Sequence, residues 1–382
     1  MIDTSHTRHL MSSPLGSARR LVVKIGSSLL VDEASGDLHQ AWLDAVCDDI
    51  ADLHRGGLDV IIVTSGAIAI GRIPLGMRDR KLRLEEKQAA AATGQMRLTQ
   101  AYHSSLDRHG ITVGQVLVTV DDTEDRRRYL NARNTLDTLL KLRAIPVINE
   151  NDTVATAEIR FGDNDRLAAR VAQMISADTL VLLSDIDGLY TADPRIDPKA
   201  TFVSEVREVT PEIEAMAGIA GSSHGSGGMV TKVIAAKICM VAGCRMAIAP
   251  GRPMRPLSAL RQTGRCTWFI PMSEPRAARK QWIAASVQPA GTLIVDSGAV
   301  TALLSGKSLL PAGVVEVTGR FDRGDTVEVL GPDGRVIGRG LSAYPDGDVR
   351  LIMGHRSEEI EAILGFRGRS EVIHRDDLAV GI

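Results

Sequence analysis

Short apolar runs alternate with stretches of helical spacing along most of this chain. Apolar residues that follow one another directly predict buried strands, and apolar residues three or four positions apart predict helices. Strands are predicted at 21–25, 60–63, 115–120, 145–148, 179–183 and 245–249, and helices at 43–53, 131–142, 164–175 and 229–241. This alternation predicts an α/β fold with a mainly parallel open sheet sandwiched by helices.

The pattern changes after residue 270. Pro, Arg and Lys are frequent at 271–286, which we interpret as a linker. Beyond it, short β-like runs are separated by turns, and Gly331-Pro332-Asp333-Gly334 has the composition of a tight hairpin. Residues 1–18 lack the apolar core of a signal peptide. We therefore expect a disordered leader (1–18), an α/β domain (19–270), the linker (271–286) and a small mostly-β domain with a C-terminal tail (287–382).

Composition narrows the class of function. A net charge of −2 over 382 residues argues against a protein that coats nucleic acid. The four cysteines form no Cys-x-x-Cys pair, so we expect buried free thiols. No apolar run is long enough to span a bilayer. These features predict a cytoplasmic protein without a membrane partner.

Two lysine-bearing loops are candidates for phosphate binding. Lys24 stands inside an otherwise apolar run that leads into Gly26-Ser27-Ser28, whose backbone N–H groups can cradle phosphoryl oxygens. A glycine-rich segment, 225–228, runs into a predicted helix that carries Lys232 near its first turn. Neither loop has the P-loop or the Gly-x-Gly-x-x-Gly spacing. Taken singly, Lys24 could instead be a snorkelling edge residue and 225–228 a flexible linker.

A cluster of acids and amides lies between these loops. Asn149-Glu150-Asn151-Asp152 ends a predicted strand, and Gly162-Asp163-Asn164-Asp165 follows closely. Carboxylates can bind an ammonium, while amides can bond a carboxylate without neutralising it, so this cluster suits a small zwitterion. Carboxylates so close together need a nearby cation, which could be Mg²⁺, a substrate ammonium or the lysines. An isolated 162–165 could also be a polar turn with an N-cap.

Taken in order, these segments resemble the amino acid kinase family, and within it the members that phosphorylate glutamate. The resemblance rests on segments distributed over nearly the whole chain after the leader: 24–28, 64–69, 131–133, 149–152, 162–165, 188–194, 227–229 and 231–232. It implies the amino acid kinase fold and ATP-dependent phosphorylation of the γ-carboxylate of L-glutamate to L-glutamyl 5-phosphate, the first step of proline biosynthesis. It also implies Mg²⁺ bound with ATP, although no metal ligands are assigned.

The resemblance assigns residues to each half of the reaction. Glutamate would be bound by Ser65, Asp152, Asp163 and Asn164. The residues expected at ATP are Lys24, Gly26, Ser184, Asp185, Ser226, Gly227, Gly228, Met229, Val230, Thr231 and Lys232. Our hypothesis for catalysis is that Lys24 and Lys232 stabilise the transferring phosphoryl group while Asp165 orients them.

The C-terminal domain resembles a PUA domain, a module of RNA-modifying enzymes, at 308–313 and 317–319. One alternative is therefore an RNA-binding or RNA-modifying protein. Residues 287–354 carry six Lys and Arg against eight Asp and Glu, a net charge of −2, so RNA is not an expected partner. Another alternative is a related kinase that forms an acyl phosphate on aspartate or N-acetylglutamate. The family resemblance also implies a homotetramer and feedback inhibition by proline. Because the acyl phosphate product is labile, our further hypothesis is its hand-over to glutamyl phosphate reductase.

Overall fold

The computed structural model describes residues 14–32, 35–78, 81–155, 164–218, 228–284 and 289–381. The chain forms two compact units, Met1–Pro275 and Arg276–Ile382. The strands of the first unit are β1 (Arg20–Ile25), β2 (Asp59–Val63), β3 (Val113–Val118), β4 (Ile145–Glu150), β5 (Thr179–Ser184), β6 (Leu189–Tyr190), β7 (Phe202–Val203), β8 (Glu205–Val206), β9 (Arg245–Pro250) and β10 (Thr267–Phe269).

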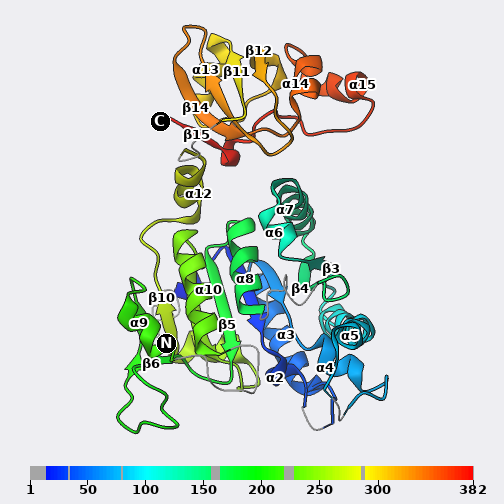
Figure 1. Cartoon of the computed structure of the whole chain (residues 1–382), viewed down its shortest axis with the longest axis vertical. Coiled ribbons are helices and arrows are strands. Elements are labelled where there is room, and N and C mark those ends of the chain that lie inside the picture. The colour runs from blue at the N-terminus through cyan, green and yellow to red at the C-terminus, as the bar shows by residue number, and fades with distance from the viewer. Residues whose placement is uncertain are drawn as a thin grey trace, which may run out of the picture. The chain divides into compact units, whose positions relative to one another are not determined.

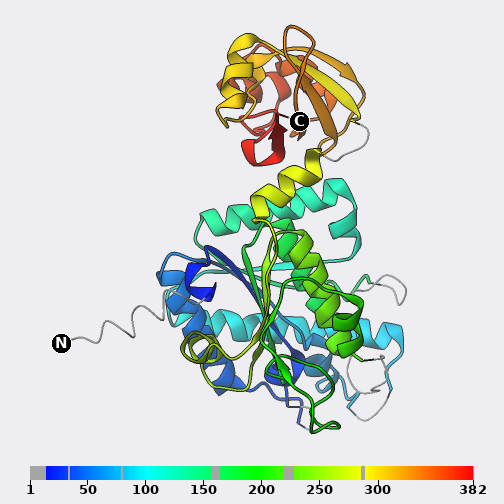
Figure 2. The same cartoon turned by 90° about the vertical axis from the view of Figure 1, so that its left-hand side faces the viewer.

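Helices connect these strands (Figures 1 and 2). They are η1 (Pro14–Ser17), α2 (Ser27–Leu30), α3 (Gln40–Arg55), α4 (Ala67–Arg72), α5 (Leu84–Asp107), α6 (Asp121–Glu124), α7 (Arg126–Lys141), α8 (Asn164–Met174), α9 (Pro211–Met216), α10 (Met229–Val241) and α11 (Pro256–Thr263).

An eight-stranded sheet in the order β3-β4-β2-β1-β5-β9-β10-β8 forms the centre of this unit. All neighbouring strands are parallel except β9 and β10, which run antiparallel. The predicted mainly parallel α/β fold is therefore confirmed. Strand order reverses on either side of β1, and in open α/β sheets this is where the carboxyl ends of the strands bind ligands.

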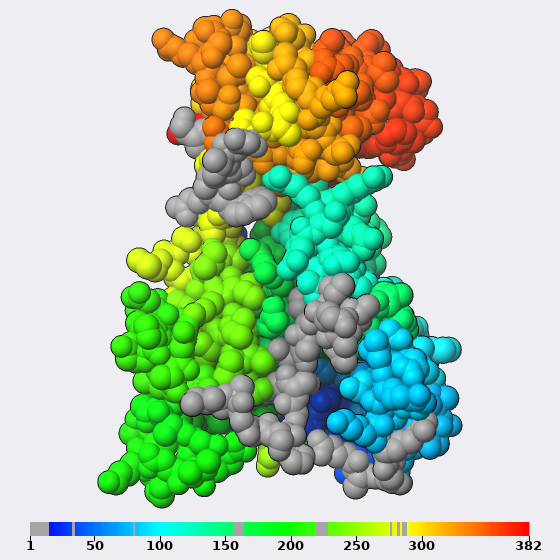
Figure 3. Space-filling model, viewed as in Figure 1, coloured from blue at the N-terminus to red at the C-terminus, as the bar shows by residue number. Residues whose placement is uncertain are grey.

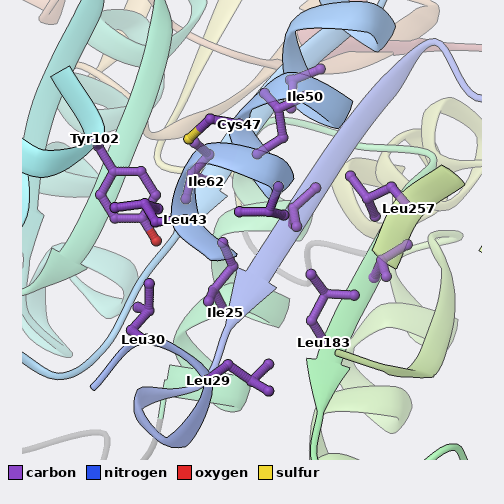
Figure 4. Packing of buried hydrophobic residues seen from close by; sticks show 14 of the residues in the cluster. Ile25, Leu29, Leu30, Leu43, Cys47, Ile50, Ile62, Tyr102, Leu183 and Leu257 are labelled. Atoms are coloured by element: carbon purple, nitrogen blue, oxygen red, sulfur yellow. The ribbon is translucent and has the colours of Figure 1, made fainter. Parts of the chain in front are cut away.

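Both faces of the sheet are buried, which explains why its strands are almost continuously apolar. Leu21 and Val23 of β1 pack against α3, α5 and α11, in the cluster that Figure 4 shows with Tyr102 and Leu257. Val22, between them, points to the other face and packs against α7, α8 and α10. Helices α7 and α10 form part of the outer surface of this unit (Figure 3).

Several expected boundaries differ from the structure. The strand expected at 115–120 lies at Val113–Val118, and the long helix α5 was not predicted. Residues 14–17, which we assigned to the leader, form η1, and the Leu15 side chain is buried in the core. The expected linker at 271–286 contains helix α12 (Pro275–Ala284), whose Arg279 pairs with Asp377 at 2.7 Å.

The second unit is built on a five-stranded sheet in the order β12-β11-β13-β14-β15. Its elements are β11 (Gly291–Val295), α13 (Ser297–Leu304), η2 (Pro311–Gly313), β12 (Val314–Gly319), β13 (Thr326–Leu330), β14 (Val336–Leu341), α14 (Asp346–Ile352), η3 (Ser357–Glu359), α15 (Ile360–Leu364), η4 (Arg375–Asp377) and β15 (Leu378–Val380). The expected hairpin joins β13 to β14, with Gly334 at a φ of 77°. The expected tail completes the sheet, because β15 pairs with β14.

No helix among the described residues is long and apolar enough to cross a membrane.

Candidate active site

Two lysines and one aspartate meet at the carboxyl edge of the large sheet. Lys24 lies near the end of β1, Asp165 in the first turn of α8, and Lys232 in the first turn of α10. Lys24 Nζ is 2.6 Å from Asp165 Oδ1, and Lys232 Nζ is 3.0 Å from Asp165 Oδ2. We call these three residues the charge triad. Each oxygen of one carboxylate thus faces a different ammonium, which fixes the positions of both lysines.

The charge triad is almost completely removed from solvent. Lys24 and Lys232 are 7% and 6% exposed, and Asp165 is fully buried. Burial alone would raise the pKa of Asp165, but the charges and hydrogen bonds of the two lysines lower this pKa overall. Thr231 also donates a hydrogen bond to Asp165 Oδ2 at 3.2 Å. The carboxylate is therefore held ionised between its two cations.

A chain of neutral amides lies on the other side of Asp165, reaching the ends of β2 and β4. Asn164, its neighbour in sequence, donates from Nδ2 to Asn149 Oδ1 at 2.8 Å and to the backbone carbonyl of Thr64. Asn149 in turn donates from Nδ2 to Gln95 Oε1 of α5 at 2.7 Å. We call Gln95, Asn149 and Asn164 the amide chain. Its members belong to three elements that are distant in sequence, α5, β4 and α8.

The other residues expected at glutamate lie at the same edge of the sheet. Ser65 follows the end of β2 and is partly buried, next to Gly66, whose φ of 98° requires a residue without a side chain. Asp152 lies two residues beyond the end of β4 and is also partly buried. Asp163 lies outside the described residues. The geometry thus gathers Ser65, Asp152 and Asn164 at neighbouring strand ends.

The residues expected at ATP lie on the opposite side of β1. Ser184 ends β5, and its hydroxyl donates to the exposed Asp185 at 3.0 Å. Gly26 follows β1, and a Cβ there would lie 3.9 Å from Lys24 Nζ, so the backbone is close to the cation. Gly228, Met229, Val230 and Thr231 form the start of α10 next to Lys232. Ser226 and Gly227 lie outside the described residues.

The acidic residues of the site do not form a dedicated metal centre in the part of the chain that the structure describes. No group of three or more His, Cys, Asp or Glu side chains is suitably arranged there. The lysines occupy both oxygens of Asp165, so of the three cations considered for this carboxylate, the structure pairs it with lysine. Mg²⁺ commonly binds through substrate phosphates and water with few protein ligands, so this arrangement fits a metal that arrives with ATP.

Three buried residues of the site were not among the predicted site residues. Asn149 and Thr64 lie in segments that carry the family resemblance but have no assigned role there, and Gln95 lies in none of these segments. Gln95 follows a run of Ala and Gly in α5 and is only 8% exposed. A buried amide must find a partner, so its place beside Gly94 on a helix face of small residues was the one available signal.

A mainly parallel sheet with two buried lysines at its carboxyl edge suits a protein that transfers a phosphoryl group, and comparison with family models agrees. The model of the amino acid kinase family matches residues 19–250, and the model of the PUA domain matches residues 291–364.

Curated relatives indicate which branch of the amino acid kinase family this chain resembles. Glutamate 5-kinase of Paramagnetospirillum magneticum is 66% identical over 96% of this chain and 99% of its own length. Glutamate 5-kinases of Rhodospirillum rubrum and Agrobacterium fabrum are 60% and 58% identical, over 94% and 97% of this chain and 96% and 95% of their own lengths. The chain therefore belongs to the glutamate 5-kinase branch of the amino acid kinase family.

Proposed function

We propose that this protein transfers the γ-phosphoryl group of ATP to the γ-carboxylate of L-glutamate and releases L-glutamyl 5-phosphate. The observation that carries the proposal is the charge triad, with its two ammonium groups held 2.6 and 3.0 Å from one buried carboxylate. The names and full-length coverage of the relatives support glutamate as the acceptor.

The nucleophile in this reaction needs no general base. A carboxylate with an ordinary pKa of about 4.3 is already ionised at neutral pH. The obstacle is repulsion between this anion and the anionic γ-phosphate. Lys24 and Lys232 supply positive charge where the phosphoryl group moves, and Mg²⁺ bound with ATP would neutralise more of its charge. Positioning and electrostatics then account for catalysis.

The roles of the individual residues follow from their places around the charge triad. Ser65, Asp152, Asp163 and Asn164 would bind glutamate on the side of β2 and β4. Gly26, Ser184, Asp185 and the segment 226–231 would bind ATP on the side of β5 and α10. Asp165 would keep the two lysines apart and aimed at the phosphoryl group between the substrates, without entering the reaction itself.

Further partners are proposed on chemical grounds. Proline carries the same α-amino and α-carboxylate groups as glutamate, so it would compete for the acceptor side as a feedback inhibitor. The acyl phosphate product hydrolyses readily, so direct hand-over to glutamyl phosphate reductase would protect it. The family resemblance supports a homotetramer. All four cysteines are free and buried, which suits a cytoplasmic location. The kinase domain is proposed at 19–270, with the preceding η1 turn packed on its core, and the PUA domain with its tail at 287–382.

The decisive test is ADP release measured with L-glutamate, L-aspartate and N-acetyl-L-glutamate, with hydroxylamine present to trap acyl phosphate. We expect turnover with L-glutamate and formation of its γ-hydroxamate. A Lys24→Ala protein purified in parallel should lose this turnover, which excludes a contaminating kinase. Faster turnover with aspartate or N-acetylglutamate would assign the protein to a different acyl-phosphate kinase.

A further inference from the structure

The direction of the hydrogen bonds in the amide chain is fixed by backbone groups. The carbonyl of Thr64 can only accept, so the atom of Asn164 beside it must be the donor Nδ2. The N–H of Glu150 can only donate, and it bonds Asn149 Oδ1 at 2.9 Å. Asn149 must therefore present its Nδ2 to Gln95, as observed. Neither asparagine can be rotated by 180° without placing like groups against each other.

This direction determines what Asn164 can offer a ligand. An amide Nδ2 has two hydrogens, and those of Asn164 are committed to Thr64 and Asn149. A polar ligand that meets this side chain therefore meets its carbonyl oxygen, which accepts hydrogen bonds. The acceptor half of the substrate carries one strong donor, its α-ammonium. The sequence pattern alone had suggested the opposite, an amide that donates to the substrate carboxylate.

Gln95 holds the far end of the chain. Its Nε2 donates to Thr99 Oγ1 at 3.2 Å on the next turn of α5, so its Oε1 is the atom left to receive Asn149. Seven residues earlier on the same helix, Gln88 donates to the carbonyl of Ala155 at 3.1 Å. Helix α5 thus holds the end of β4 at Asn149 and the segment after β4 at Ala155, on either side of Asp152.

Helix α5 is itself held at a fixed distance from the site. A Cβ added to Gly94 would lie 1.8 Å from the carbonyl oxygen of Ala67 in α4, and a Cβ added to Gly71 would lie 1.8 Å from that of Ala90. The two helices therefore touch backbone to backbone. Because α4 begins directly after Ser65 and Gly66, this contact sets Gln95 in register with the loop after β2.

We propose that Gln95 is a positioning residue: through Asn149 it turns the carbonyl oxygen of Asn164 toward the acceptor substrate, where that oxygen binds the α-ammonium. Gln95 itself does not touch the substrate. This inference rests on the proposed function, because it takes Asn164 as a glutamate-binding residue. It adds to that function the chemical group that Asn164 recognises and the buried residue that orients the Asn164 side chain.

Gln95→Leu tests the proposal, since leucine has a similar size but accepts no hydrogen bond. Asn149 Nδ2 then loses its partner and holds Asn164 less firmly, although the backbone bonds of Thr64 and Glu150 remain, so KM for glutamate should rise about 10-fold. kcat and KM for ATP should stay within about twofold. The matched control is Gln100→Leu, which makes the same change at an exposed position of α5 whose amide bonds Ser104, and it should behave as wild type.

A substrate analogue separates positioning from general disorder. Glutarate keeps both carboxylates of glutamate but lacks the amino group, so its inhibition constant against glutamate should change less than about twofold in Gln95→Leu. Gln95→Glu keeps an acceptor oxygen for Asn149 and should restore most of the glutamate affinity. Parallel losses for glutamate and glutarate, or no loss for either, would overturn the proposal.

The wild-type protein supplies an independent test that does not depend on any variant folding. Glutamate should bind at least about 10-fold more tightly than glutarate, because only glutamate donates to Asn164. Equal affinities would refute the ammonium assignment even if Gln95→Leu proved unstable. A wild-type protein with no glutamate turnover would instead refute the proposed function, so the two failures are distinguishable.

Discussion

On the phosphoryl side of this site two lysines are positioned by a charge, whereas on the acceptor side Asn164 is positioned by neutral amides. In the charge triad, one buried carboxylate is shared by Lys24 and Lys232. In the amide chain, Asn164 is oriented by Asn149 and Gln95, none of which carries a charge. The two arrangements meet at adjacent residues, 164 and 165, at the start of α8.

This difference matches the demands of the two ligands. A moving phosphoryl group carries concentrated negative charge, which nearby cations offset strongly. The acceptor carries an ammonium and a carboxylate on the same α-carbon, so a full charge on the protein there would favour one of these groups and repel the other. Amides with a fixed orientation can accept from the ammonium or donate to the carboxylate without adding a charge. The two sides should therefore respond differently to loss of charge, to pH and to loss of a single hydrogen bond.

The largest expected effect is on stability, from Asp165→Asn. The change leaves two buried ammonium groups without their carboxylate, and breaking a buried ion pair in this way costs about 3–5 kcal/mol of unfolding free energy. Urea unfolding at neutral pH measures the loss. Asp193→Asn breaks the exposed pair with Arg195 and should match wild type. A loss below about 1 kcal/mol for Asp165→Asn would mean that the charge triad is not the tightly coupled unit described above.

Lys232→Ala should give the largest effect on catalysis. Removing one cation at the transferring phosphoryl group should lower kcat by about 10²–10³-fold, with a much smaller change in KM for glutamate. Steady-state kinetics measure both constants. Lys237→Ala, on the exposed face of the same helix, is the control and should leave kcat unchanged. A change confined to KM would place Lys232 in acceptor binding instead.

Titration with acid should distinguish the two sides. The folded pKa of Asp165 is lowered, so its contribution to stability is present above the unfolded pKa of about 3.9 and is lost as pH falls toward the folded pKa. The difference in unfolding free energy (the stability gap) between wild type and Asp165→Asn should therefore narrow below about pH 4. The gap between wild type and Gln95→Leu should stay constant, because amides do not titrate. Urea unfolding across this pH range checks both, and parallel behaviour of the two gaps would contradict the distinction.

The smallest effect is expected from Tyr102→Phe. The buried Tyr102 hydroxyl lies 3.0 Å from Thr64 Oγ1, behind the amide chain, and losing this bond should cost about 1 kcal/mol of unfolding free energy. The Thr64 carbonyl would still accept from Asn164, so KM for glutamate should not change. Thermal unfolding and steady-state kinetics measure the two quantities. A rise in KM would show that the orientation of Asn164 also depends on this hydroxyl.

The contrast between the two sides also explains what could be predicted from sequence. Lys24 is conspicuous because a lysine rarely interrupts an apolar strand, and Lys232 follows a glycine-rich segment that is easy to recognise. The strands were predictable because burial on both faces makes them continuously apolar. These features are local, so a short window of sequence contains them.

The residues that support the acceptor side lie far apart in the sequence. Gln95 and Asn149 are 54 positions apart, and their contact depends on the register of α5 against the sheet. Helix α5 itself escaped prediction because its buried face mixes Ala, Gly and buried polar side chains such as Gln95 with only a few large apolar residues, which weakens the apolar periodicity. The direction of the hydrogen bonds could be assigned only from the structure, where a backbone group of known polarity lies beside each asparagine.

The glycine contact between α4 and α5 has a consequence for attempts to re-engineer the enzyme. Substrate preference is usually altered by grafting the loop that touches the ligand. Here α5 holds the end of β4 and the loop after it through Gln95 and Gln88, and the contact with α4 fixes the position of α5. A graft of residues 149–155 alone would therefore carry over the side chains without the contacts that orient them. A successful chimera would have to exchange the two helices and both strand-end loops as one block, or keep Gly71, Gly94 and Gln95 in common between donor and host.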